Sequence, residues 1–255
     1  MNAYELKPLA VGDILDTAFT VYRRNFGTLI TLAIVCLGLP ALVSITLNLS
    51  GGVLVHPWLA LWSVVLAGVG GVLEAGAVVR AVSEAYLGHT PAVGDALGAA
   101  FSEFWMIAGA GFLRYLLIFL ATLLLFVPGI VVACGYAVVI PVIMLEDTPG
   151  SQRVFGVLGR SWRLTKGFKG TAFALGIVMV VIIMVPAMAV GILAAMMPTF
   201  APAIGGLANI VQLAIAPAIA CVVTVFYYDL RVRKEAFDLD RLAQDLGMAP
   251  EAAGA

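Results

Sequence analysis

The feature that most constrains this chain is a series of six apolar runs, each about 18 residues or longer. A helix of that length can cross a hydrocarbon layer of about 30 Å. Only 11% of the residues are charged, against about 25% in an ordinary soluble domain. The sequence therefore predicts an all-α polytopic membrane protein with six transmembrane helices. They are placed roughly at residues 28–49, 58–79, 105–127, 128–145, 171–197 and 204–228.

The charged residues are distributed unevenly between the two ends of these runs. The connections after runs one, three and five contain no charge, whereas thirteen of the fourteen Lys and Arg residues lie in the N-terminal segment, two long loops or the C-terminal tail. The exception is Arg114. Basic residues are retained on the cytoplasmic side during insertion. We therefore expect both termini and both long loops in the cytoplasm, with three hairpins entering the membrane from that side.

A short phrase occurs twice, as VGDILDTAF at residues 11–19 and VGDALGAAF at residues 93–101, with six of nine positions identical. Each copy directly precedes a hairpin, and its apolar residues recur at helical spacing. The segment before the third hairpin keeps Leu158 and Trp162 at the positions of Leu15 and Phe19. The alternative is chance recurrence of a Val-, Gly- and Ala-rich phrase.

We interpret the phrase as an amphipathic helix at the cytoplasmic membrane surface, with its apolar face in the acyl boundary. Such helices are expected near residues 11–25, 92–104 and 151–166. Each would precede one hairpin of a parallel repeat, because all three hairpins enter in the same orientation. The expected organisation is one transmembrane domain over residues 1–228, followed by a short cytoplasmic tail, 229–255, with a disordered end. The repeats span about 8–80, 91–146 and 150–228.

Three stretches combine charged and aromatic residues in a more specific way: YELKPLAVGDILDTAFTVYRRNFGTLI at the start, MLEDTPGSQRVFGVLGRSWRLTKG in the third cytoplasmic segment and FYYDLRVRKEAFDLDRLA near the end. Together they resemble the bacterial glycerophosphoryl diester phosphodiesterase membrane-domain family. They are more distantly similar to inner-membrane proteins of the YciC type. The resemblance covers nearly the whole chain and implies a location in the bacterial inner membrane.

The activity in that family name belongs to a separate TIM-barrel domain, which needs about 250 residues of its own. The resemblance therefore implies a non-catalytic membrane region here. The sequence contains no GxSxG, HExxH, P-loop or dinucleotide fingerprint in a suitable context. We expect a protein that is not an enzyme, with no catalytic residues, no metal and no cofactor.

Five basic residues follow one another with no acidic residue among them: Arg153, Arg160, Arg163, Lys166 and Lys169. Anionic headgroups attract such residues by about 1 kcal/mol each near a membrane surface. The cluster therefore predicts contacts with anionic lipid, and simple topological anchoring is an equally good interpretation. Nucleic acid is an unfavourable partner, because the net charge of the chain is only −1.

Two opposite charges lie inside consecutive apolar runs. At about 1.5 Å per residue, Glu74 lies about 9 Å and Arg114 about 13 Å from the predicted cytoplasmic boundary. A lone charge there costs about 2.5–3.5 kcal/mol. We therefore expect a buried ion pair. In the alternative, Arg114 reaches the headgroups, and Glu74 is protonated or bonded to a neighbour.

Two classes of function remain. The first is a protein that organises membrane lipid or an unknown membrane-protein partner through its surface helices. The second is a transporter or channel for a small solute or lipid, with a cavity between the repeats. Transport requires connected polar residues across several spans, and the spans offer few beyond Glu74, Arg114, Asn209 and Gln212. The sequence alone favours the first class.

Overall fold

A computed structural model describes residues 9–50, 55–146 and 154–245, and every regular element in these ranges is a helix. The helices are α1 (Val11–Arg24), α2 (Phe26–Leu49), α3 (Pro57–Tyr86), α4 (Val93–Ser102), α5 (Phe104–Leu124), α6 (Phe126–Gly135), α7 (Val139–Leu145), α8 (Val154–Thr165), α9 (Lys169–Met196) and α10 (Ala201–Asp245), with a short 3-10 turn at Pro198–Phe200.

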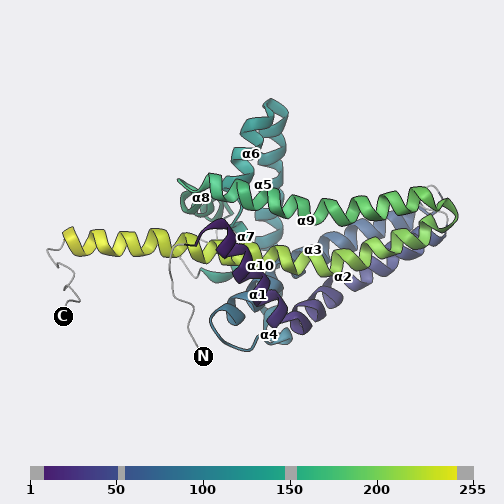
Figure 1. The fold of residues 1–255 in the computed structure, drawn as a ribbon, viewed down its shortest axis with the longest axis horizontal. Helices are drawn as coiled ribbons and strands as arrows, with labels where there is room; N and C mark the ends of the chain where they lie inside the picture. The colour runs from purple at the N-terminus through teal and green to yellow at the C-terminus, as the bar shows by residue number, and fades with distance from the viewer. Residues whose placement is uncertain (1–8, 51–54, 147–153, 246–255) are drawn as a thin grey trace.

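Six segments in this part of the chain are long and apolar enough to cross a membrane: α2, α3, α5, the α6–α7 segment, α9 and Pro198–Glu235. The prediction of an all-α chain with six candidate membrane-spanning helices is confirmed. Figure 1 shows α2, α3, α9 and α10 running along one another, with the end of α2, the start of α3 and the α9–α10 connection at one end. Helices α1, α4 and α8 lie toward the other end.

The last helix continues well past the expected end of the sixth span at residue 228. Helix α10 runs to Asp245, and both Asp229 and Leu230 are buried. The first part of the expected tail, 229–255, is therefore part of the packed protein, because its apolar and hydrogen-bonded residues contact earlier segments. Its end, 246–255, which was expected to be disordered, lies outside the described residues.

Three short helices precede long ones at the predicted places: α1 before α2, α4 before α5 and α8 before α9. The junction residues Asn25, Glu103 and Phe168 share one backbone conformation, with φ of −113°, −99° and −119° and ψ of 21°, 8° and 18°. Each residue interrupts the helical path and redirects the chain into the following long helix.

The apolar faces of the short helices pack against the protein core, whereas the sequence interpretation placed them in the acyl boundary. Core packing leaves Phe19 59% and Phe101 64% exposed, at the same position of the repeated phrase. The buried residues are Ile14, Ala18 and Val21 of α1, Ala96 and Ala100 of α4, and Val157, Leu158 and Leu164 of α8.

The α5–α6 hairpin contacts the other helices mainly at its base. Ile107 and Ala110 near the start of α5 are buried, whereas Phe119 and Leu124 toward its end are exposed. Figure 1 shows the hairpin pointing up the page, while the four long helices run across the page. Three hairpins entering the membrane in the same orientation were expected. The second hairpin departs from that arrangement because only its base meets the bundle.

Helices α2 and α3 approach most closely where α2 contains a proline. Pro40 has no backbone N–H, so the carbonyl of Cys36 loses its usual helical hydrogen bond. A Cβ atom at residue 70 would lie 2.2 Å from that carbonyl oxygen. Only glycine at position 70 permits this approach, which brings the backbone of α3 against the freed carbonyl.

The predicted fourth span is two helices, α6 and α7, and α8 docks onto the break between them. The hydroxyl groups of Ser161 and Thr165 donate to the carbonyl oxygen of Gly135 over 3.0 and 3.1 Å. A Cβ atom at residue 135 would lie 2.2 Å from the Trp162 ring. A glycine carbonyl left at the end of α6 thus becomes the anchor for the third short helix.

Candidate functional site

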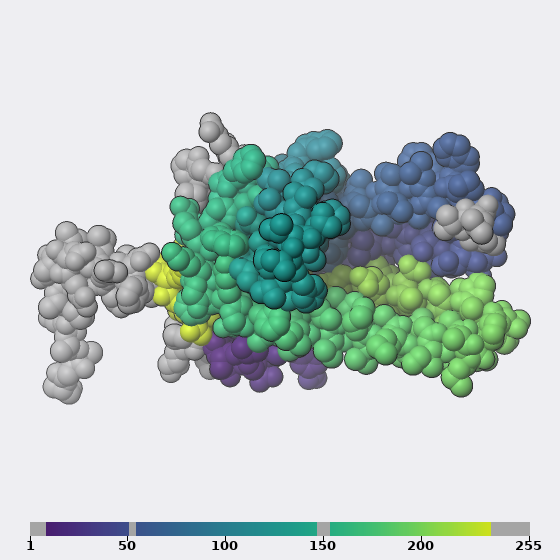
Figure 2. Space-filling model, turned by 90° about the horizontal axis from the view of Figure 1, so that it is seen from above, coloured from purple at the N-terminus to yellow at the C-terminus, as the bar shows by residue number. Residues whose placement is uncertain are grey.

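A large cleft lies between the α5–α6 hairpin and the long helices. It encloses about 780 Å³, and α3, α5, α6, α7, α9 and α10 all contribute lining residues. Its walls are mainly apolar, with Ile118, Ile177 and Ile219 among them. In Figure 2, which looks down on the projecting hairpin, a trough separates the blue row of α3 from the green row of α9. The cleft thus lies where the α5–α6 hairpin projects away from the long helices.

Two charged side chains line this mainly apolar cleft. Glu74 comes from α3 and is only 7% exposed, and Arg114 comes from α5. The Arg114 Nη2 atom donates to the hydroxyl of Tyr115 over 3.1 Å, and the guanidinium lies 4.7 Å from the centre of that ring. Glu74 Oε1 and Arg114 Nε are buried and have no hydrogen-bond partner among the described residues.

The predicted ion pair between Glu74 and Arg114 is not formed: within the described ranges no salt bridge of 4.0 Å or less joins them. Their depths along the chain are similar, but depth does not fix the direction of the two helices. Because α5 turns away from the bundle, its arginine and the α3 carboxylate face a shared space. The structure brings both residues to one cleft without direct contact.

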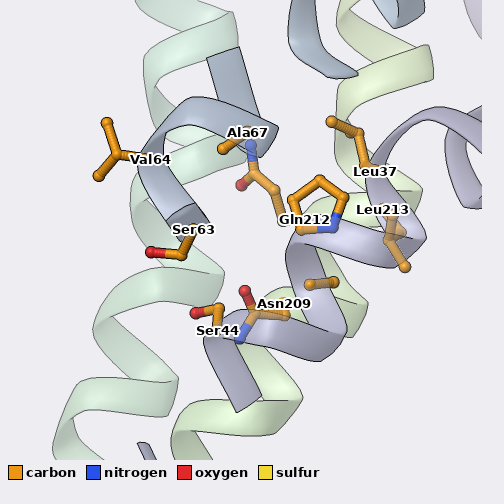
Figure 3. A pocket seen from close by; sticks show the side chains of 10 residues that line it. Leu37, Ser44, Ser63, Val64, Ala67, Asn209, Gln212 and Leu213 are labelled. Carbon is orange, nitrogen blue, oxygen red and sulfur yellow. The ribbon is translucent and has the colours of Figure 1, made fainter. Parts of the chain in front are cut away.

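A smaller pocket of about 250 Å³ lies farther along α10, between α2 and α3. Ser44, Ser63, Asn209 and Gln212 bring polar atoms to it, as Figure 3 shows. Ser63 and Asn209 bond to backbone carbonyls of their own helices. Gln212 lines both the pocket and the large cleft. The four polar span residues picked out in the sequence, Glu74, Arg114, Asn209 and Gln212, therefore each line the large cleft or the smaller pocket.

Residues 226–235 of α10, here called the hub, hold several helices together. Tyr227 donates to Glu146 Oε1 over 3.0 Å. Arg160 of α8 donates to both Glu146 oxygens, over 3.1 and 2.8 Å, and to Glu235 over 2.7 Å. Arg231 completes the network by donating to Glu235 over 2.8 Å. These contacts connect the end of α7, α8 and α10.

A second cluster attaches the N-terminal segment to the hub. The Asp229 carboxylate accepts the backbone N–H of Leu9 and Nε of Arg233, both over 2.8 Å. Arg233 also donates to the Leu9 carbonyl oxygen over 2.6 Å. The neighbouring Tyr228 hydroxyl lies 2.6 Å from that of Ser83 on α3. The sequence analysis missed these contacts between distant segments, although Asp229 and Arg233 themselves show the i, i+4 spacing of helical ion pairs.

The basic residues of the predicted lipid-binding cluster have different surroundings in the structure. Arg160 forms ion pairs with Glu146 and Glu235, and the sequence cluster did not indicate these two partners. Burial lowers the pKa of its guanidinium, but the hydrogen bonds to the two carboxylates outweigh burial and raise that pKa. Lys169 lies 3.4 Å from the centre of the Trp162 ring.

Arg163 and Lys166 remain exposed, and Arg163 also accepts the Lys234 ammonium at its backbone oxygen. Arg153 lies outside the described residues. The surface that could attract anionic headgroups is thus smaller than the sequence cluster.

The described ranges contain no candidate metal site, because no three His, Cys, Asp or Glu side chains in them form a group that could hold an ion. The fold defines the class as a helical protein with six candidate membrane-spanning segments. No family model, curated protein or solved structure matches the chain.

Proposed function

We propose that this protein binds an amphipathic, lipid-class molecule in the cleft between the α5–α6 hairpin and the α3–α9–α10 side of the bundle. A cleft of about 780 Å³ falls within the range of about 300–1,000 Å³ typical of ligand pockets. Apolar walls suit an acyl chain, and Glu74, Arg114 and Gln212 suit a polar end. The function is binding or transfer of the amphiphile, without a chemical reaction.

One observation carries this proposal. Glu74 and Arg114 line the same cleft, and the buried atoms Glu74 Oε1 and Arg114 Nε have no hydrogen-bond partner among the described residues. An unsatisfied buried polar group costs about 1–3 kcal/mol, and more when charged. A ligand with a polar end would remove that cost. The cleft favours the transport-class interpretation over organisation of lipid by surface helices alone.

A photoactivatable phospholipid tests the proposal in vesicles containing the purified protein. At low probe fraction, labelling of Ile177 and Ile219 in the cleft is expected to saturate and to fall when unlabelled lipid competes. Labelling of Ile34 and Val35, exposed on α2 and not lining the cleft, should increase in proportion to the probe. Non-saturable labelling at all four positions would reject the binding site.

We further propose the membrane arrangement: a bacterial inner-membrane protein with cytoplasmic termini and three repeats that each begin with an interfacial helix. The common junction geometry at Asn25, Glu103 and Phe168 supports the repeats. The exposed Phe19 and Phe101 would anchor α1 and α4 at the acyl boundary while the rest of each apolar face packs on protein. The resemblance to the phosphodiesterase membrane-domain family is part of this proposal.

Labelling of introduced cysteines tests the orientation. The native Cys36, Cys134 and Cys221 are buried, so an impermeant maleimide reports mainly on introduced sites. In intact cells, Thr199→Cys is expected to react from outside and Lys166→Cys only after the membrane is opened. The reverse pattern would invert the topology, and equal reaction at both sites would exclude the span assignment.

A further inference from the structure

We infer that the cleft selects amphiphiles whose polar end carries both a positive and a negative charge. This inference rests on the proposed function and specifies the headgroup that the cleft would take. It follows from the opposite charges of Glu74 and Arg114, which face the same space from α3 and α5 without pairing. Within the described lining of the cleft, they are the only acidic and the only basic side chain.

The separation of the two charges gives the cleft its selectivity. A zwitterionic headgroup can place its cation against Glu74 and its anion against Arg114, so the Glu74 Oε1 and Arg114 Nε atoms each gain a partner. An anionic headgroup satisfies Arg114 but leaves the Glu74 carboxylate unpaired beside another negative charge. A neutral headgroup leaves both charges without an ionic partner. Leaving one buried charge unpaired is strongly unfavourable, so the zwitterion binds best.

The remaining polar groups are consistent with this assignment. The hydroxyl of Tyr115 already accepts from Arg114 Nη2 and thereby orients the guanidinium, while Nε has no partner within the described ranges. Gln212 adds an uncharged amide, which can donate and accept. Ile130 and Ile140 contribute apolar walls, which can contact acyl chains but offer no polar group to a headgroup. Charge selection therefore depends on Glu74 and Arg114.

Competition against a fluorescent phospholipid analogue bound to the full chain in detergent measures this preference. Four competitors are compared: phosphatidylethanolamine, phosphatidylglycerol, diacylglycerol and water-soluble glycerophosphoethanolamine. We expect the half-displacing concentration of phosphatidylethanolamine to be about tenfold lower than those of the anionic and neutral lipids, equivalent to about 1.4 kcal/mol. If glycerophosphoethanolamine displaces the analogue as well as phosphatidylethanolamine does, the ligand is a zwitterionic solute, and the assignment of a lipid is overturned.

Single substitutions separate the two charges. Glu74→Gln is expected to remove the preference for phosphatidylethanolamine over phosphatidylglycerol, and Arg114→Gln the preference over diacylglycerol. Arg80→Gln, which removes an exposed charge that does not line the cleft, should leave both ratios unchanged. Glu74→Asp and Arg114→Lys keep the charge and should retain part of the preference, which distinguishes lost selection from a damaged fold.

The outcomes distinguish this inference from the function on which it rests. Equal displacement by all three lipids in the unmodified protein would overturn headgroup selection and leave amphiphile binding intact. Failure of the analogue to bind saturably would remove the proposed function itself. Unchanged lipid ratios in both Glu74→Gln and Arg114→Gln would show that these charges do not select the headgroup.

Discussion

Glu146→Ala is expected to lower the free energy of unfolding by about 1–3 kcal/mol, the cost of leaving buried hydrogen-bonding groups without a partner. The Glu146 side chain is only 6% exposed and accepts hydrogen bonds from Arg160 and Tyr227. Its removal leaves the Nε atom of Arg160 and the hydroxyl of Tyr227 without their acceptor. Because these residues connect α7, α8 and α10, the loss should affect the cooperative unfolding of the whole bundle.

Denaturant titration of the purified protein in detergent, followed by circular dichroism, measures this effect. Glu84→Ala is a matched control, because Glu84 forms an i, i+4 pair with Arg80 whose arginine side chain is 44% exposed. Its loss should cost only about 0.3–0.5 kcal/mol. Comparable losses in the two variants would show that the Glu146 network does not hold the bundle together.

Gly176→Trp is expected to weaken binding of the fluorescent phospholipid analogue at least tenfold, or by about 1.4 kcal/mol. Gly176 lies on α9 in the wall of the cleft, and a Cβ atom there would meet no atom of another segment within 4 Å. The indole ring can therefore extend into the space that the proposal assigns to the ligand. Stability should change little, because the new side chain enters a hollow and not a packed core.

The same helix offers a control for this substitution. Gly191 also has open space at its Cβ position, but it lines neither hollow. Gly191→Trp adds the same ring to α9 and should leave the affinity within twofold of the original, roughly 0.4 kcal/mol. An equal loss in both variants would indicate a general disturbance of α9, and no loss in either would place the ligand elsewhere.

Length and apolar content predicted the six candidate spans, because both are properties of consecutive residues. The helical spacing in residues 11–25 likewise predicted α1. The direction of the α5–α6 hairpin was not predictable in this way, since it depends on where α5 finds a packing partner. For that reason, the predicted ion pair between Glu74 and Arg114 was wrong, although the sequence places both charges inside apolar runs.

In the hub, too, contacts between neighbouring residues could be predicted from the sequence, whereas contacts between distant residues could not. The i, i+4 spacing of Asp229 with Arg233 is a property of neighbouring residues and is enough to indicate their ion pair. The contact of Arg160 with Glu235 joins residues 75 positions apart, and no periodicity encodes it. The sequence analysis therefore missed Glu146, which directly follows an apolar run and accepts hydrogen bonds from α8 and α10.

Photo-crosslinking of the unmodified protein, Gly176→Trp and Gly191→Trp in the same vesicles tests the central claim most directly. The measured quantity is the competable fraction of lipid attached at Ile177 and Ile219, with attachment at Ile34 as the internal reference. The proposal predicts a competable fraction in the unmodified protein and in Gly191→Trp, and its loss in Gly176→Trp. Competable attachment of equal size in all three proteins would contradict a lipid-binding cleft at this position.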